Sequence, residues 1–182
     1  MTLPRRWARA LEEHEAAIET CIATGRSVPD AKWNEPRREG KWSPAQQLAH
    51  VGLAYQMVLD GLDARPPKPL LPPLRQFVLR TFFLPWMIRG DNFRRGVPAP
   101  MELLPAGQPD DRASLEALLR TRASRCVAAM EAAYGRGVRR VSHPYFGAVP
   151  LLSMLRLGTA HTRHHTRFIA RAAEASIRPQ PC

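Results

Sequence analysis

The fold of this chain is decided by a helix that begins in the stretch Ser43-Pro44-Ala45-Gln46-Gln47-Leu48-Ala49-His50-Val51-Gly52-Leu53-Ala54-Tyr55. Ser43 can cap the helix, Pro44 suits the first helical position, and Gln46 at the third position completes a capping box. The apolar pattern continues to about Leu62 and is free of charge over most of that length. A helix that is apolar on nearly every side is buried or packs against two partners. We therefore expect a central helix here.

Apolar residues at helical spacing predict three further helices, over residues 7–25, about 112–133 and about 150–175. No strand pattern competes with them, so the chain is expected to be all-α. A long crossover, about 64–111 and proline-rich at both ends, separates the second and third helices. A crossover of that length lets these two helices run parallel. The sequence thus predicts one domain, residues 1–182, built as an up-down-down-up four-helix bundle with a partly helical crossover.

The formal charge is +11 at pH 7, from 27 Lys and Arg against 16 Asp and Glu. Nearly all of the excess is arginine, and it lies after residue 63. Such a surface attracts phosphates and acidic ligands non-specifically. Because the basic residues form no nucleic-acid-binding motif, we expect an arginine-rich solvated surface and no specific nucleic-acid partner.

The crossover contains an apolar and basic piece, residues 75–84, ahead of Pro85. Its aromatic side chains could cover the mouth of the bundle or a subunit interface, or they could bind an anionic membrane surface or nucleic acid. We favour the first pair of roles because the apolar piece is short and is broken by Pro85. The aromatic residues concerned are Phe77, Phe82, Phe83 and Trp86.

The cysteines and the N-terminus bear on location. Cys21, Cys126 and Cys182 are odd in number and widely spaced, which predicts neither a disulfide framework nor a zinc knuckle. Residues 1–19 mix charged and apolar side chains and lack the apolar core of a signal peptide. No stretch approaches the roughly 20 apolar residues of a membrane span. We expect a cytoplasmic protein with no membrane span and no cleaved leader.

Three histidines on two predicted helices carry the strongest chemical information. His161 and His165 are four residues apart, so both rings lie on one helix face, about one turn apart. His50 lies at a similar depth if its helix runs antiparallel to theirs. Three neutral imidazoles leave a divalent ion its full charge and an open coordination position, which is typical of a catalytic metal site. His164 points roughly 100° away from His165 and is expected to lie beside the ligands or at the surface.

Three motifs now define a family resemblance: Trp42-Ser43-Pro44-x-x-x-Leu48-x-His50, the turn His143-Pro144-Tyr145-Phe146-Gly147, and His161-x-x-His164-His165. With them the chain resembles the DinB-like superfamily over most of its length, and most closely a subgroup of unknown function with the same turn and double histidine. The resemblance implies an up-down-down-up bundle, often dimeric, with nickel or zinc on His50, His161 and His165. Some members of that superfamily transfer low-molecular-weight thiols or isomerise thiol adducts. The long basic crossover departs from the better-understood members.

Three other residues invite more ordinary interpretations. His14 lies on the apolar stripe of the first helix, where it is expected to pack in the core with its ring nitrogen hydrogen-bonded, although it could approach the metal. His143 is expected to serve its turn, where Pro144 and Gly147 set the backbone. Arg122 is expected to extend its charged end to solvent, with the anchoring of an anionic substrate as the alternative.

Carboxylates are not expected near the histidines. The last helix has no acidic residue before Glu174, and the second helix has none before Asp60. The sequence also lacks a Ser-His-Asp arrangement, a glycine-rich phosphate loop and paired carboxylates. A metal-bound hydroxide or thiolate would then have to act as the nucleophile. Together with the resemblance, this predicts a metal-dependent enzyme that acts on a small molecule by thiol transfer or hydrolysis. The alternative is a non-enzymatic, stress-associated binding protein with a structural metal or no metal.

Overall fold

A computed structural model describes the chain except for residues 1–3, 64–67, 91–92, 94–102, 105–110 and 175–182. The described part is predominantly helical, as expected. Within it, no helix combines the length and the apolarity that crossing a bilayer requires. The long helices, with bounds close to the predicted ones, are α1 (Arg5–Arg26), α3 (Pro44–Leu62), α6 (Arg112–Gly135) and α7 (Leu151–Glu174), and a short α2 (Asp30–Trp33) follows α1.

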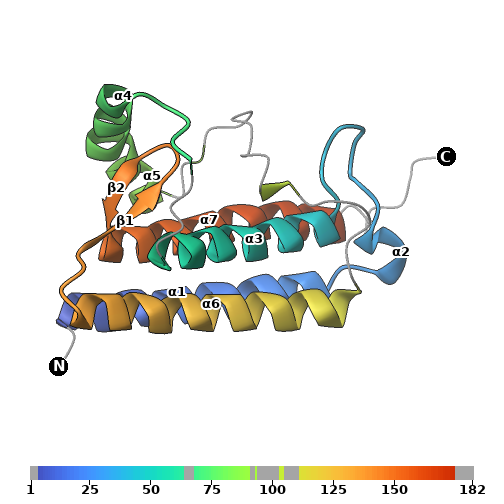
Figure 1. Cartoon of the computed structure of the whole chain (residues 1–182). Coiled ribbons are helices and arrows are strands. Elements are labelled where there is room, and N and C mark those ends of the chain that lie inside the picture. Colours follow the sequence, from blue (N-terminus) through green and yellow to red (C-terminus); the bar gives the residue numbers. More distant parts are fainter. Residues whose placement is uncertain (1–3, 64–67, 91–92, 94–102, 105–110, 175–182) are drawn as a thin grey trace.

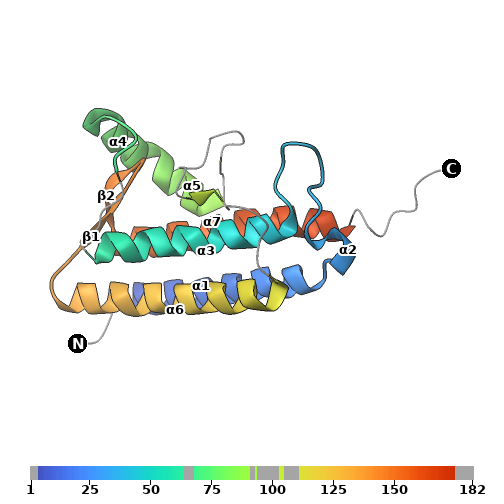
Figure 2. The same cartoon turned by 45° about the vertical axis from the view of Figure 1, so that its right-hand side comes forward.

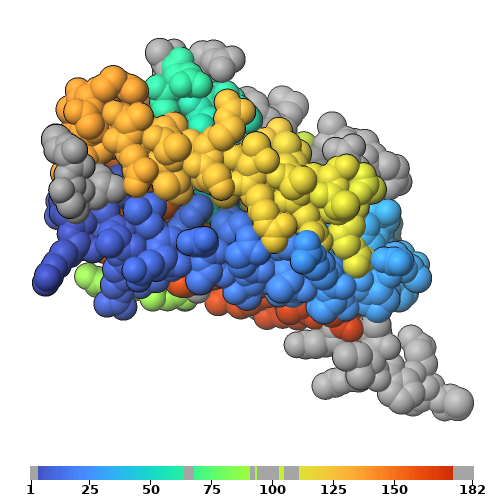
Figure 3. Space-filling view, turned by 90° about the horizontal axis from the view of Figure 1, so that it is seen from below, coloured from blue at the N-terminus to red at the C-terminus, as the bar shows by residue number. Residues whose placement is uncertain are grey.

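The long helices form two layers (Figures 1 and 2). α1 and α6 form one layer, and Figure 3 shows them side by side on one face of the molecule. α3 and α7 form the other layer. Across the layers, α1 packs mainly against α7, and α3 packs mainly against α6. The colours in Figure 1 run in one direction along α1 and α7 and in the opposite direction along α3 and α6.

The start of α3 follows the predicted capping box. The Gln46 backbone N–H donates to Ser43 Oγ at 3.2 Å, and the Ser43 backbone N–H donates to Gln46 Oε1 at 2.9 Å. Pro44 occupies the first helical position. This cap fixes where the helix begins, and the helix then directs His50 into the protein interior.

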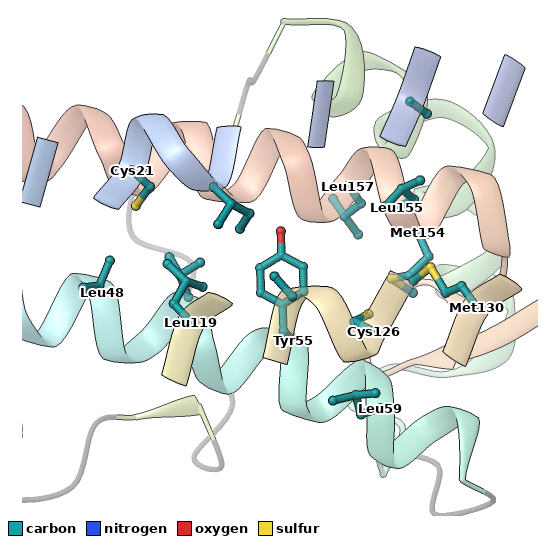
Figure 4. Close-up of a cluster of buried hydrophobic side chains, with 14 of the residues drawn as sticks. Cys21, Leu48, Tyr55, Leu59, Leu119, Cys126, Met130, Met154, Leu155 and Leu157 are labelled. Carbon is teal, nitrogen blue, oxygen red and sulfur yellow. The ribbon is translucent and has the colours of Figure 1, made fainter. Parts of the chain in front are cut away.

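The core lies between the two layers. Figure 4 shows Tyr55 of α3 pointing into it, near Leu119 and Cys126 of α6. The buried Tyr55 hydroxyl forms a hydrogen bond of 3.0 Å with Thr162 Oγ1 of α7. Cys21 and Cys126 are buried and free, and burial raises the pKa of their thiols to about 11 and about 12. Cys182 lies outside the described residues.

A β-hairpin between α6 and α7 shows that the expectation of a chain without strands is wrong. β1 (Arg140–His143) pairs antiparallel with β2 (Gly147–Pro150), and His143 lies opposite Gly147. Gly147 has a φ of +63°, which a residue with a Cβ rarely adopts, so it allows the chain to reverse. The hairpin escaped prediction because strands of four residues are too short to establish an alternating pattern.

The described part of the crossover is a continuous helical segment. It consists of α4 (Pro73–Val78), the π-helical turn η1 (Leu79–Phe83) and α5 (Leu84–Gly90). The expectation that Pro85 breaks this piece is wrong. In an α-helix, the proline ring would clash with the carbonyl four residues earlier. Here the preceding turn is wider, and the Leu84 N–H donates to the Leu79 carbonyl, five residues earlier.

The aromatic side chains of this segment are largely exposed, and their expected role in covering the mouth of the bundle stays a prediction. Phe77, Phe82 and Trp86 are 52%, 65% and 49% exposed. Leu84, by contrast, is buried, and α5 packs against α7. α4 lies beyond the hairpin, away from the layer of α1 and α6 (Figures 1 and 2). A subunit interface on this segment stays a prediction.

Candidate metal-binding site

α3 and α7 bring His50, His161 and His165 together. The ring nitrogens that these residues offer lie within 4.8 Å of one another. His161 Nε2 is 3.2 Å from His50 Nε2 and 3.1 Å from His165 Nε2. His50 and His165 are buried, whereas His161 is partly exposed. The three histidines singled out in the sequence therefore form one cluster, and its more accessible side is at His161.

The orientation of His50 is fixed by the crossover. His50 Nδ1–H donates to the backbone carbonyl of Leu103 at 2.8 Å. A carbonyl oxygen can only accept, so the proton of the neutral ring resides on Nδ1. The lone pair of His50 Nε2 therefore faces the cluster. This contact was not predicted, because Leu103 lies in a part of the crossover without a helical or alternating pattern.

The orientation of His165 is fixed by α3. His165 Nδ1–H donates to Gln47 Oε1 at 2.5 Å, and both side chains are buried. The lone pair of His165 Nε2 therefore also faces the cluster. Gln47 precedes His50 by three residues, so one face of α3 provides both His50 and the group that orients His165. The sequence signal for this role was the three-residue interval between Gln47 and His50, in a helix nearly free of charged side chains.

The arrangement of nitrogens fits a metal ion. Nε2 lone pairs that converge on one point repel each other unless a proton or a cation lies between them. Nitrogens about 2.1 Å from a common ion lie about 3.0 to 3.4 Å apart for angles between right and tetrahedral. Two of the three separations, 3.1 and 3.2 Å, fall in this range, and all three nitrogens lie within 4.8 Å of one another. Imidazole nitrogens suit zinc, nickel, copper and iron, so the cluster could hold a divalent ion of this group.

The electrostatics keep the three rings neutral. Burial holds the pKa of His161 and of His165 well below the usual value, and the charges of the neighbouring histidines lower both further. Burial also lowers the pKa of His50, although the hydrogen bond to the Leu103 carbonyl opposes this shift. Near neutral pH each ring is therefore unprotonated at one nitrogen, as a metal ligand must be.

Aromatic side chains surround the cluster. The Trp42 ring lies 4.6 Å from the His50 ring and 6.2 Å from the His165 ring, measured between centroids. The Phe93 ring lies 5.5 Å from the His161 ring. Apolar surroundings restrict the access of water to such a site. Trp42 belongs to the motif that precedes α3, whereas Phe93 was not predicted to contribute.

His164 lies outside the cluster, although it is adjacent to His165 in the chain. Its ring lies 5.0 Å from Phe93 and 4.9 Å from Phe168. The group of residues that could hold an ion contains His50, His161 and His165 and not His164. The position of its side chain agrees with the predicted rotation about the helix axis.

His14 packs in the core, as expected, and does not join the cluster. Its ring meets Tyr55 edge-on at a centroid distance of 5.4 Å. The expectation of a satisfied ring is wrong for Nε2, which has no hydrogen-bond partner among the described residues. Burial lowers the pKa of His14 to about 4, so the ring is neutral in the folded protein at neutral pH.

His143 serves its turn, as expected, because its Nδ1 accepts a hydrogen bond of 3.2 Å from the Tyr145 backbone N–H. Burial lowers the pKa of His143 to about 4. Arg122 is partly buried and lies against α3 at Gly52. Burial lowers the pKa of Arg122, and the charge of Asp60 opposes the shift. Neither side chain belongs to the histidine cluster.

Comparisons with known proteins add one finding. The sequence profile of the DinB superfamily matches residues 6–169, which extend from α1 into α7 and include all three clustered histidines. Neither a curated protein nor a solved structure matches the chain.

Proposed function

Because the chain belongs to the DinB superfamily, we propose that His50, His161 and His165 bind a divalent metal ion and that the protein is a metal-dependent enzyme acting on a small molecule. One observation carries this proposal. The Nε2 atoms of the three rings converge, while the Nδ1 atoms of His50 and His165 donate to fixed oxygens. Buried histidines that merely pack in a core also need hydrogen bonds, but they do not need ring nitrogens that converge on one point.

Nickel or zinc is the ion that we propose. The three ligands are neutral nitrogens, a donor set that suits both ions, and the family resemblance implies the same pair. The directions of the helices in Figure 1 support the up-down-down-up bundle, with the single domain of residues 1–182. In such a bundle, α3 and α7 are antiparallel neighbours and place the histidines at one depth.

The reaction that we propose is thiol transfer or hydrolysis. A divalent ion on three neutral ligands supplies a Lewis acid that lowers the pKa of water or of a thiol. Gln47 and the Leu103 carbonyl hold the rings in place, and Trp42 and Phe93 exclude water from their sides. The cluster includes no carboxylate among the described residues. A substrate with an acidic proton of its own, such as a low-molecular-weight thiol, suits a site of this kind.

Metal content tests the ligand assignment. Protein purified without a histidine tag should contain about one divalent ion per chain by elemental analysis. His50→Ala, His161→Ala and His165→Ala should each lose most of that ion. His164→Ala is the matched control, because it removes an adjacent histidine outside the cluster and should retain the metal. Equal loss in all four variants would defeat the assignment.

The alternative function is a non-enzymatic, stress-associated binding protein with a structural metal or no metal. Ligand exchange distinguishes it from an enzyme, because a catalytic site keeps an exchangeable position. The cobalt-substituted protein should develop sulfur-to-metal charge-transfer absorption when small thiols are added. If cobalt is bound but neither thiols nor water exchange onto it, the enzymatic proposal fails. Protein that binds no metal would support the metal-free alternative.

We also propose a cytoplasmic homodimer. The dimer rests on the family resemblance, and the location rests on the free buried thiols of Cys21 and Cys126. Sedimentation equilibrium at several protein concentrations would test the dimer. A molar mass equal to one chain at every concentration would contradict it.

A further inference from the structure

The crossover presents the largest concentration of exposed apolar side chains in the described part of the chain. Nine large hydrophobic residues are exposed in the part of the chain that the structure describes, and seven of them lie between positions 70 and 86. Leu74 and Phe82 are the most exposed, at 75% and 65%. Apolar clusters of this kind mark contact surfaces. We call this surface the crossover face; its residues are Leu70, Leu74, Phe77, Val78, Phe82, Phe83 and Trp86.

Most of these side chains belong to one continuous helical segment. The π-helical turn carries the helix from Pro73 through Pro85 to Gly90 without a break. The exposed apolar residues of this segment include Leu74, the adjacent pair Phe77 and Val78, and then Phe82 and Trp86 at intervals of four. Their side chains are exposed, whereas Leu84, Met87 and Ile88 of the same segment pack in or against the core. Exposed phenylalanine and tryptophan side chains with basic residues beside them are features of helices that lie at a membrane surface.

The charge of the segment has one sign. Residues 68–90 contain Lys68, Arg75, Arg80 and Arg89 and no Asp or Glu. Arg75 and Arg89 are exposed and have no ion-pair partner among the described residues. Arg80 donates to the Phe146 carbonyl at 3.0 Å, which attaches the segment to the hairpin. The crossover face therefore combines exposed apolar rings with positive charge that acidic residues of the segment do not offset.

We propose that the crossover face docks on an anionic phospholipid membrane. A symmetric contact between two copies through this face would oppose arginines to arginines, without carboxylates to compensate. Anionic headgroups complement the arginines, and aromatic rings favour the depth of the headgroups. Charge complementarity thus favours a lipid surface over a second copy.

The structure presents the crossover face on a firm support. Leu84 is buried, and α5 packs against α7. The Leu70 backbone N–H donates to the Pro144 carbonyl at 3.0 Å, which joins the start of the segment to the hairpin turn. Docking therefore requires no unfolding of the segment. In Figures 1 and 2, α4 lies at the edge of the molecule, where a flat surface can reach it.

Vesicle co-sedimentation of the full-length protein tests this proposal. The protein should sediment with vesicles of phosphatidylglycerol and phosphatidylcholine, and it should stay in the supernatant with phosphatidylcholine alone. Binding should weaken steeply between about 50 mM and about 500 mM salt, because salt screens the attraction. Failure to bind the anionic vesicles at low salt would overturn the proposal.

Two pairs of variants connect binding to the crossover face. Arg75→Gln with Arg89→Gln should weaken partitioning by about fivefold for each charge. Leu74→Ser with Phe82→Ser should weaken it about tenfold or more, because two exposed apolar side chains no longer insert. The charge control is Arg5→Gln with Arg125→Gln, two exposed arginines on α1 and α6. The apolar control is Val138→Ser, an exposed hydrophobic residue outside the face.

Both controls should bind vesicles as the wild type does. Equal loss in Arg5→Gln with Arg125→Gln would show attraction by net charge alone and would overturn the proposal. Sedimentation equilibrium supplies a second measurement. If the wild type is a dimer and Leu74→Ser with Phe82→Ser is a folded monomer, the face is a subunit interface and the lipid proposal fails. Circular dichroism of each variant verifies that its helices are retained.

Discussion

Gln47 on α3 accepts a hydrogen bond of 2.5 Å from His165 Nδ1 on α7, across 118 positions of the chain. The contact is buried and joins the two helices that carry the candidate ligands. It holds the proton of His165 on Nδ1 and leaves Nε2 directed at His50 and His161. The packing of α3 on α7 and the orientation of a candidate ligand thus depend on the same pair of side chains.

Replacing Gln47 by Leu should weaken metal binding about 10- to 100-fold, the usual effect of losing a group that orients a ligand. Competition with a chromophoric chelator would measure the affinity. Gln56→Leu is the matched control, because Gln56 lies on the same helix and donates to Asp60 Oδ1 at 2.9 Å, outside the cluster. Gln47→Glu retains an acceptor and should bind metal more tightly than Gln47→Leu. Unchanged affinity in Gln47→Leu would contradict the assigned role.

Replacing Ser43 by Ala should lower the free energy of unfolding by about 1 kcal/mol, because the Gln46 N–H loses its acceptor at the start of α3. Urea denaturation followed by circular dichroism would measure the change. Ser124→Ala is the control, since Ser124 is exposed in the middle of α6 and caps no helix. A loss in Ser124→Ala as large as that in Ser43→Ala would show that the cap is not the cause.

Alanine substitutions at Gly147 and Gly137 distinguish the effect of backbone strain from the effect of steric overlap. Both have positive φ, +63° and +87°, so alanine should destabilise either position by about 1 kcal/mol. A Cβ at Gly147 would also overlap Gln76 Oε1, whereas a Cβ at Gly137 has nothing within 4 Å. Gly147→Ala should therefore lose about 1 kcal/mol more in urea denaturation.

The same pair of positions allows a direct test of the overlap. In a Gln76→Ala background, the additional loss in Gly147→Ala should shrink, because the overlapping atom is gone. The Gly137→Ala loss should be the same in both backgrounds. If the Gly147→Ala loss does not depend on residue 76, the contact between the hairpin and α4 is not its source.

His14 should make stability depend on pH. Burial lowers its pKa from 6.5 to about 4 in the folded protein, so the unfolded chain binds the proton more readily. The contribution of the neutral, buried ring to the stability of the folded protein is present in full above about pH 6.5 and declines as the pH falls toward 4. Between pH 7 and pH 4 the wild type should therefore lose about 3 kcal/mol more than His14→Leu. If the unfolding free energies of the wild type and His14→Leu change in parallel with pH, His14 is not the source of the pH dependence.

The parts of the fold that the sequence predicted are those with long, repeated patterns. The cap at Ser43 and the apolar run after it located α3 to within a residue or two. The four-residue interval between His161 and His165 placed both rings on one face because a helix has 3.6 residues per turn. His50 on α3 could be predicted as the third ligand, because a four-helix bundle brings α3 beside α7.

The parts that the sequence did not predict depend on contacts between distant or irregular segments. Leu103 and Phe93 reach His50 and His161 from pieces of the crossover that have no helical or alternating pattern. The strand pair at His143 and Gly147 is too short for a periodic signal. Pro85 suggested a break because a proline normally ends or bends an α-helix, and the wider hydrogen bonding ahead of it is invisible in composition.

The π-helical turn at Leu79–Phe83 makes the crossover sensitive to its length. Deleting one residue there would return the turn to α-helical bonding, and the Pro85 ring would then clash with the carbonyl four residues before it. The kink that follows from this clash would displace Leu84 from its buried position. Substitutions at the exposed Phe82 leave this register intact, whereas a single-codon insertion or deletion does not. In this segment, chain length constrains the gene more tightly than the identity of its exposed residues does.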